Sequence, residues 1–285
     1  MLNFFFVSDL HGSKDRYISL FEKIIEERPH AVFMGGDILP SGLMNLVVDN
    51  SPDFIGDVLI AGFTKVKEQL KEDFPKVFII LGNDDGKADE ESFIDVSQQG
   101  LWEYIHGKKV HFRGYDIYGY AYVPPSPFLL KDWEKYDVSR YVDPGCIAPD
   151  EGSHSTDVDL KKLQFTTIKK DLDLLTEGEN LSKSIFLFHS PPYKTNLDRA
   201  ALDGKMIEYI PLDVHIGSIA IQRFIEDYQP LITLHGHVHE SASITGYWSD
   251  KIENTYCFSA AHNGKELAII KFNPDNASEA VRELV

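Results

Sequence analysis

The chain has little cysteine and no long apolar run. Its 285 residues contain two cysteines, Cys146 and Cys257, which are too few for the disulfide framework of a small secreted domain. No segment approaches the roughly 20 consecutive apolar residues that a membrane span requires. The apolar start, Leu2 to Val7, meets the charged Asp9 without a basic leader before it. We therefore expect a protein of the reducing cytoplasm with no membrane segment.

Basic residues are also scarce relative to acidic ones. Lys and Arg number 28 against 45 Asp and Glu, so the formal net charge is -17. Such a surface repels polyanions, and we do not expect nucleic acid as a partner. A small phosphate substrate is still compatible with this charge, because divalent cations can offset carboxylates locally. The composition leaves open whether the chain forms an oligomer.

Apolar runs typical of buried strands alternate with amphipathic helical patterns along much of the chain. The expected strands are Asn3 to Val7, Ala31 to Met34, Val77 to Leu81, Ile185 to Phe188 and Leu231 to Leu234. The expected helices are Lys14 to Glu27, Asp53 to Asp73, Asp159 to Leu175 and Ile216 to Tyr228. This alternation indicates an α/β architecture.

Two later runs, Thr255 to Ala260 and Leu267 to Phe272, flank the dipeptide Asn263-Gly264. Because this dipeptide is typical of tight hairpin turns, we predict an antiparallel hairpin here. The whole pattern fits a layered α/β sandwich with central mixed β-sheets flanked by helices. We expect one domain over residues 1–285 with a helical insertion at about residues 40–75.

The stretch from Tyr115 to Asp157 combines many aromatic residues with five prolines. The prolines exclude a long helix. Two interpretations stay open for this segment of about residues 115–157. It could be a lid that contributes to a substrate pocket, or a long ordered loop that packs on the core.

Each of the five expected strands ends at side chains able to bind a metal ion. These side chains are Asp9, His11, Asp37, Asn83, His189, His237 and His239. Ligands gather at the carboxyl ends of strands in open α/β sheets, so residues far apart in sequence can converge there. So many polar groups in one region would be costly without a ligand. Nitrogen and oxygen donors without thiolates suit Mn, Fe, Zn, Co or Ni.

The short motifs around these side chains resemble those of the calcineurin-like metallophosphoesterases. They are Asp9-Leu10-His11, Gly36-Asp37, Gly82-Asn83-Asp84-Asp85, His189 and Gly236-His237-Val238-His239, within residues 1 to about 245. The resemblance implies two divalent or mixed-valence transition-metal ions, with manganese the first choice. It assigns one ion to Asp9, His11 and His239, the other to Asn83, His189 and His237, and a bridging role to Asp37. It also implies hydrolysis of a phosphate ester by metal-activated hydroxide.

The sequence departs from the family directly after the motif asparagine. The family commonly has a histidine there, which stabilises charge near the leaving group, whereas this chain has Asp84. An aspartate has a reference pKa of about 3.9, so it is ionised at pH 7 and is a poor proton donor. We expect Asp84 to act near the leaving group without this donor role, which His11 or His215 could take. The replacement favours a small phosphodiester, with a phosphomonoester as the alternative.

Other polar residues near the motifs could contact the substrate. Asn83 and Arg199 are our candidates for binding the substrate phosphate. His215 and Ser218 either bring a helix N-terminus to a phosphate oxygen or simply begin and cap that helix. We expect His235 to orient the turn that follows it.

Two other functions are alternatives to the hydrolysis of a small phosphate ester. The first is a non-catalytic scaffold of the same fold, but all seven ligand positions are filled in this chain. The second is a nuclease, which the acidic composition disfavours.

Overall fold

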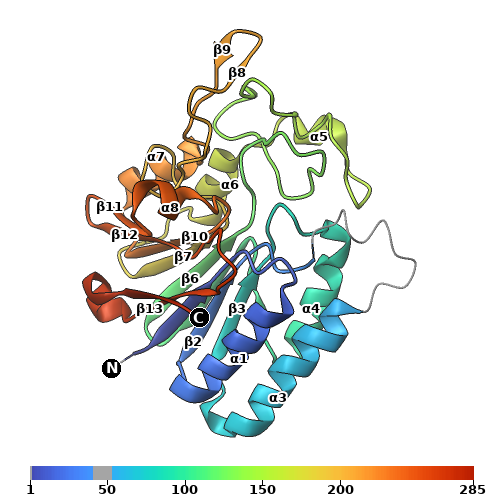
Figure 1. Cartoon of the computed structure of the whole chain (residues 1–285). Helices are drawn as coiled ribbons and strands as arrows, with labels where there is room; N and C mark the ends of the chain where they lie inside the picture. The colour runs from blue at the N-terminus through green and yellow to red at the C-terminus, as the bar shows by residue number, and fades with distance from the viewer. Residues whose placement is uncertain (1, 41–52) are drawn as a thin grey trace.

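The computed structural model describes residues 2–40 and 53–285, and two six-stranded mixed sheets lie at its centre (Figure 1). Across the first sheet the strands are β14 (Val281–Leu284), β13 (Ala268–Phe272), β1 (Phe4–Val7), β2 (Ala31–Gly35), β3 (Lys76–Ile80) and β4 (Glu103–Tyr104). Across the second they are β11 (Ser249–Ile252), β12 (Thr255–Ser259), β10 (Ile232–His235), β7 (Ser184–Phe188), β6 (Tyr115–Tyr120) and β5 (Lys108–Phe112).

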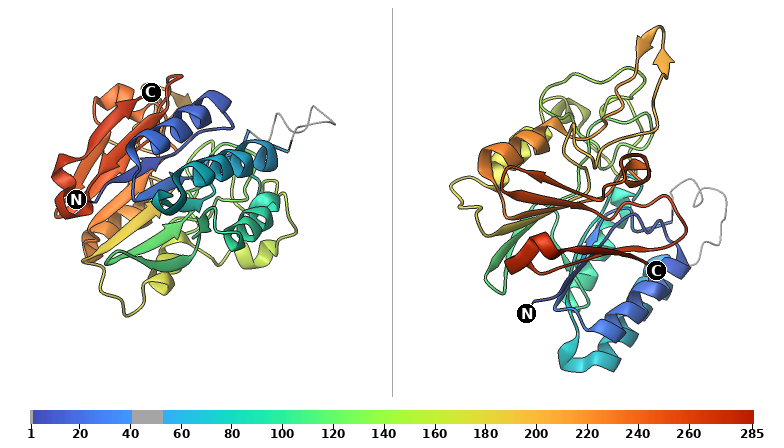
Figure 2. Two further views of the ribbon diagram at one scale, coloured as in Figure 1. Left: turned by 90° about the horizontal axis from the view of Figure 1, so that it is seen from below. Right: turned by 60° about the vertical axis from the view of Figure 1, so that its left-hand side comes forward.

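Helices cover the outer faces of both sheets (Figures 1 and 2). On the side of the first sheet these are α1 (Lys14–Glu27), α3 (Ala61–Leu70) and α4 (Glu90–Gln98). On the side of the second they are α6 (Ile168–Leu175) and α7 (Ile219–Tyr228), and the short α8 (Ser241–Thr245) follows the loop after β10. Shorter elements are η1 (Ile55–Ile60), η2 (Lys71–Asp73), η3 (Lys87–Asp89), α5 (Leu160–Leu163), η4 (Pro274–Glu279) and the small hairpin β8 (Met206–Ile207) with β9 (Ile210–Pro211). No helix in the described ranges is long and apolar enough to cross a membrane.

The two faces of the second sheet pack in two different hydrophobic cores. Ile117, Ile185 and Leu187 point inward and belong to the core shared with the first sheet. Phe186 and Phe188 point outward and pack in a second cluster with residues of α6 and α7. This period of two is what a strand buried on both faces produces. The layered α/β sandwich predicted from the sequence is confirmed.

The central strands bring their carboxyl ends to the same region. β1, β2, β3 and β4 run parallel in the first sheet, as do β6, β7, β10 and β12 in the second. The long connections after β6 and β7 form the loops at the top of Figure 1. The molecule therefore has one loop-covered edge to which both sheets contribute.

The predicted hairpin between Thr255–Ala260 and Leu267–Phe272 is wrong. β12 lies in the second sheet between β10 and β11, whereas β13 pairs with β1 and β14 in the first. Both strands are buried on both faces, so the local pattern does not distinguish their sheets. The tight turn precedes β12 instead, between Ile252 and Thr255, where Glu253 has a positive φ of 51°.

Two predicted helices have different bounds from those expected. The helix predicted over Asp159–Leu175 is broken into α5 and α6, because Thr167 accepts from Lys170 N and starts a new helix. The helix predicted from Ile216 begins at Ile219, after Ser218 as its N-cap. The predicted insertion at 40–75 lies partly outside the described residues, since 41–52 are not among them. Its remainder packs Phe63 and Val66 into the main core.

The aromatic segment 115–157 is not uniform. Its first six residues are β6, an interior strand of the second sheet, so any lid is limited to the residues after Tyr120. The following loop contains a buried ion pair between Lys131 and Glu134 at 2.5 Å, and Trp133 is fully buried beside it. A segment with this much buried structure is an ordered loop, and whether it also closes over a substrate stays open.

Candidate metal centre

The ligand-bearing strand ends turn sharply. Asp9, His11, Asp37 and His237 all have positive φ, between 46° and 73°. This left-handed conformation is uncommon for residues other than glycine, although Asp, Asn and His adopt it more readily than most. Each such residue costs of order 1–3 kcal/mol unless its surroundings hold it. Four such residues in one region indicate that a functional arrangement is being maintained.

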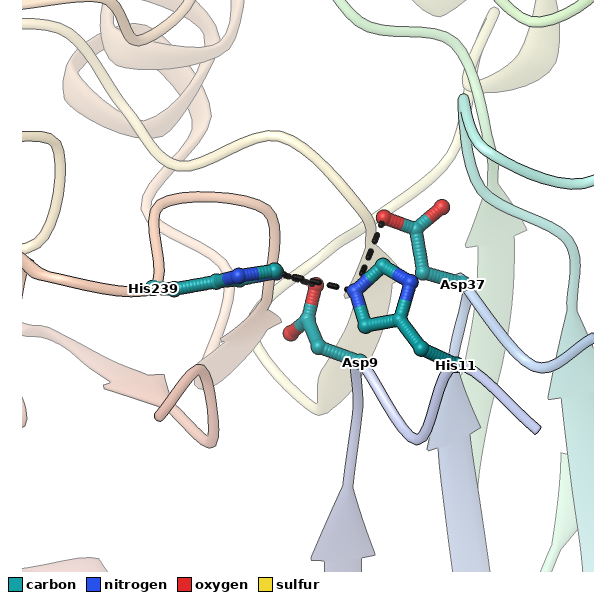
Figure 3. A group of neighbouring side chains, drawn as sticks. All are labelled: Asp9, His11, Asp37 and His239. Atoms are coloured by element: carbon teal, nitrogen blue, oxygen red, sulfur yellow. Dashed lines mark hydrogen bonds and ion pairs between the residues drawn. The ribbon is translucent and has the colours of Figure 1, made fainter. Parts of the chain in front are cut away.

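Four of the predicted ligands form one group, drawn in Figure 3. Asp9, His11, Asp37 and His239 each offer a donor atom, and these atoms all lie within 4.8 Å of one another. His11 Nε2 is 3.0 Å from His239 Nε2, which is itself 3.2 Å from Asp9 Oδ1. Asp9 is buried, and its Oδ1 also accepts a hydrogen bond from His237 N at 2.9 Å.

A second group lies around His189, at the end of β7. Its Nε2 is 3.0 Å from Asn83 Oδ1, and its ring centroid is 5.3 Å from that of His237. Its Nδ1 is 2.7 Å from the carbonyl oxygen of Gly35. Because a carbonyl can only accept, Nδ1 carries the proton when Nε2 is a metal ligand.

Asp37 lies between the two groups. Its Oδ2 is 3.8 Å from His11 Nε2 and 3.3 Å from His189 Nε2. Its other oxygen, Oδ1, accepts a hydrogen bond from the backbone of Asp84 at 2.8 Å. The structure thus brings all seven predicted ligands together, with one carboxylate in contact with both sets.

The charges in the cluster perturb the pKa values of its members. Burial disfavours the charged form of His11, but Asp84 and Asp37 outweigh this and raise its pKa to about 9. Burial acts in the same sense on His189, where the charge of Asp37 raises the pKa to about 9. Burial alone would raise the pKa of Asp37, but His189 and His11 lower it to about 2. The carboxylates therefore favour the protonated forms of His11 and His189, and the negative potential that does so would also attract a metal cation.

The donor set is of a kind that binds metal ions. Imidazole nitrogens, carboxylate oxygens and one amide oxygen converge with no thiolate among them, a combination suited to Mn, Fe, Co, Ni or Zn. The hydrogen bond from Nδ1 of His189 to the carbonyl oxygen of Gly35 is of the kind that orients a metal-binding imidazole. A metal ion would offset the carboxylates that meet here.

Neighbouring residues hold the ligand loops in place. The buried Asp85 accepts hydrogen bonds from Ile38 N, Leu39 N and Gly82 N, so it ties the loop after β2 to the loop after β3. Arg16, a residue of α1, donates a hydrogen bond to the carbonyl oxygen of Asp9 at 2.5 Å. The position of Arg16 has no motif in the sequence, so sequence reasoning missed this support.

The other predicted site residues have well-defined partners. His215 Nδ1 is 2.8 Å from Asp198 Oδ1, and Asp198 is fully buried. This carboxylate also accepts from Lys194 N and Thr195 N, so it holds His215 against the loop that follows β7. The Asp198 contact was missed because nothing in the local sequence couples it to a residue 17 positions later.

Arg199 and the N-terminus of the helix after Ser218, two of the places suggested for binding a phosphate oxygen, both have other partners. Arg199 directs its guanidinium to Asp203 at 2.5 Å and to the carbonyl oxygen of Ala200. The N-terminus of α7 is occupied by Asp137, which accepts from Ile219 N and Ala220 N. Ser218 therefore caps the helix, and a phosphate oxygen would meet a carboxylate there. His235 is buried with hydrogen bonds to Ser190 and Thr233, which agrees with an orienting role.

Comparison with known proteins gives one family and several shared folds. Residues 2–241 match the family model described as calcineurin-like phosphoesterase. An uncharacterized protein of Methanocaldococcus jannaschii is 37% identical over 84 residues, which are 29% of this chain and 33% of that protein. The match thus spans about a third of that relative's length.

Solved structures with similar folds have low sequence identity to the chain. A Thermus thermophilus protein has a TM-score of 0.53 at 12% identity, covering 99% of this chain and 98% of its own. A dimetal phosphatase from Danio rerio has a TM-score of 0.51 at 12% identity, covering 99% and 95%. A phosphopantetheinyl hydrolase from Mycobacterium tuberculosis has a TM-score of 0.50 at 12% identity, covering 91% and 89%. At these identities the likeness extends to the fold alone.

Proposed function

Because the chain belongs to the calcineurin-like phosphoesterase family, we propose that it hydrolyses a small phosphate ester with two transition-metal ions. The observation that carries the proposal is the position of Asp37. Its Oδ2 contacts His11 on one side and His189 on the other. A carboxylate shared in this way fits two neighbouring ions better than one.

The proposed ligands divide between the two groups. Asp9, His11 and His239 would hold one ion, and Asn83, His189 and His237 the other, with Asp37 shared. When bound, such a pair supplies Lewis acidity at the phosphate and a nucleophile at neutral pH. The carbonyl of Gly35 and the carboxylate of Asp84 would keep the rings of His189 and His11 turned toward the ions.

The leaving group of the ester needs a proton donor from the chain. Asp84 occupies the place of the family's histidine, and a carboxylate is a poor acid at pH 7. We propose His215 as the donor to the leaving group, because buried Asp198 holds its ring through Nδ1 and leaves Nε2 for substrate. His11 is the alternative donor, although its two ring nitrogens already face Asp84 and His239.

The substrate we favour is a small phosphodiester, with a phosphomonoester as the alternative. Asn83 is the better placed of the two proposed phosphate-binding residues, since its Oδ1 lies beside His189 in the cluster. Arg199 would first have to leave Asp203. Manganese is our first choice of metal, and the compartment we propose is the cytoplasm.

A substrate panel tests the proposal. Metal-depleted protein would be given Mn, Fe, Zn, Ni or Mg and assayed against phosphodiesters and phosphomonoesters of equal leaving-group pKa. We expect metal-dependent turnover that Asp37→Asn abolishes, and faster turnover of the diesters. Tight binding of two ions with no turnover of any ester would favour the scaffold. Faster turnover of the monoesters would favour a phosphatase.

A further inference from the structure

We infer that Asp84 is a positioning residue for His11, an inference that rests on the proposed metal centre. Asp84 Oδ2 lies 3.1 Å from His11 Nδ1. The opposite nitrogen of the same ring, Nε2, faces His239 Nε2 at 3.0 Å and Asp37 Oδ2 at 3.8 Å. A carboxylate at Nδ1 favours the tautomer with its proton there. The lone pair of Nε2 is then directed into the cluster.

Asp84 also holds a second ligand, through its backbone. Its N–H donates to Asp37 Oδ1 at 2.8 Å. Asp37 therefore keeps Oδ2 turned toward His11 and His189. One residue in the loop after β3 thus orients a ligand from the loop after β1 and another from the loop after β2.

His189 provides an internal comparison for this role. Both imidazoles present Nε2 to the cluster and have Nδ1 held by an oxygen, but His189 uses the backbone carbonyl of Gly35. Its orientation therefore does not depend on any single side chain. His11 depends on the side chain of Asp84, so a substitution there can alter one metal position while leaving the other intact. Hydrogen-bond partners of metal-binding histidines commonly matter in this way.

The geometry separates this role from direct metal binding. The carboxylate of Asp84 lies against Nδ1 of His11, at the opposite side of the ring from Nε2, the nitrogen that faces His239 and Asp37. Its side chain is 35% exposed, so water can reach it and its charge is partly screened. The effect we expect is therefore specific to the His11 ring rather than a general attraction of cations.

A double-mutant cycle on metal binding tests the inference without any substrate. Mn²⁺ would be titrated into metal-depleted protein, with binding followed by the electron paramagnetic resonance of free Mn²⁺. Asp84→Ala should weaken one of two sites by about 10–100-fold. Asp84→Asn, whose amide oxygen can still accept from Nδ1, should weaken it less. Asp95→Asn, an exposed residue of α4 that changes the net charge equally, should have no effect.

The cycle is completed by repeating each substitution in a His11→Gln background. If Asp84 acts through the His11 ring, Asp84→Ala should change affinity by less than about twofold there, because the interaction it removes is already absent. An equal loss in both backgrounds would mean that Asp84 acts by charge alone and would overturn the inference. Loss of one bound ion from Asp84→Asn, with the other unaffected, would make Asp84 a ligand and would also overturn it. Should Asp84→Ala not fold, Asp84→Leu gives the same comparison, because leucine is close to aspartate in size and cannot accept a hydrogen bond from Nδ1.

Failure of the proposed function is recognised separately. The titration measures only ions, and the ester panel measures only turnover. A chain that binds two ions and shows the coupling between Asp84 and His11, yet turns over no ester, retains the positioning role and loses the proposed activity. A chain that turns over esters without that coupling loses only the positioning role.

Discussion

The Nδ1 atom of His189 lies 2.7 Å from the carbonyl oxygen of Gly35, and this contact joins the two sheets at the metal centre. His189 follows β7 of the second sheet, and Gly35 ends β2 of the first. The proposed ligands divide in the same way between the sheets.

Removing one of the proposed metal ligands should affect metal content and turnover together. Asp37→Asn or His189→Ala should lower metal content and reduce kcat/KM by more than about 100-fold, beyond the cost of losing a supporting hydrogen bond. Elemental analysis and steady-state kinetics measure the two effects. The control is His111→Ala, because His111 is an exposed histidine on β5. Full activity in either ligand variant would remove the proposed mechanism.

Metal binding should release protons from the imidazoles. In the metal-free protein His11 and His189 have pKa values raised to about 9, so both carry a second proton at pH 7. A metal ion must displace these protons, and the apparent affinity should therefore rise from pH 6 to pH 9. Calorimetry in buffers of different ionisation enthalpy would count the protons released. A pH-independent affinity over this range would contradict the prediction.

The metal-free protein should show the opposite trend in stability. Because both histidines have folded pKa values above the unfolded value of about 6.5, their stabilising contribution is complete below pH 6.5 and is lost as pH rises toward 9. Chemical denaturation of chelator-treated protein at pH 6 and pH 9 should show this loss. The same experiment on His11→Gln should show a smaller difference between the two pH values. An equal difference in both proteins would assign the effect to other groups.

The proton donor should be revealed by the leaving group. His215→Asn should reduce turnover of alkyl esters by on the order of 10²–10⁴ and affect p-nitrophenyl esters much less. Asp84→His, compared at matched metal occupancy, should improve poor leaving groups more than p-nitrophenyl esters if the family's histidine role can be restored. Equal effects on both ester classes would show that these positions act through metal affinity or general electrostatics.

The loop after β6 should influence substrate choice if it forms a wall or lid of the pocket. Phe128 and Leu129 are exposed in this loop, at 61% and 60%. Replacing both with serine should change KM or substrate preference and leave metal content unchanged. Ile18→Ser, at an exposed apolar position on α1, is the control. Unchanged kinetics on every substrate would leave this loop with a structural role only.

The sequence predicted that the candidate ligands converge, but it did not predict the contacts that hold them in place. Asp9, His11 and Asp37 stand where buried apolar runs end, so their convergence follows from the general behaviour of parallel strands. The contacts of Arg16 with Asp9 and of His215 with Asp198 depend on how the loops fold back, which no local pattern encodes. The pairing of Asp84 with His11 joins residues 73 positions apart and could not be foreseen from spacing.

The error over β12 and β13 has a similar physical origin. Local turn signals indicate where a chain can reverse, but the choice of partner depends on the sheet that has an open edge. β13 pairs with β1, and its carboxyl-terminal neighbour β14 completes that edge. The Asn263-Gly264 dipeptide lies in the loop that connects β12 of the second sheet to β13 of the first. The Gly264 carbonyl oxygen accepts a hydrogen bond from Arg16 at 2.6 Å.

The pairing of β1 with β13 also sets the order in which the protein can assemble on the ribosome. Strand β1 is synthesised long before its antiparallel neighbour, which begins at residue 268, after all seven proposed ligands. Until β13 is synthesised, the edge of β1 next to Asp9 lacks a partner strand. His237 and His239 are added only about 30 residues before β13. Pairings between such distant segments form slowly. A chain that has not yet reached residue 268 therefore has an unpaired apolar strand edge at β1, and one that has not reached His239 cannot complete the proposed metal centre.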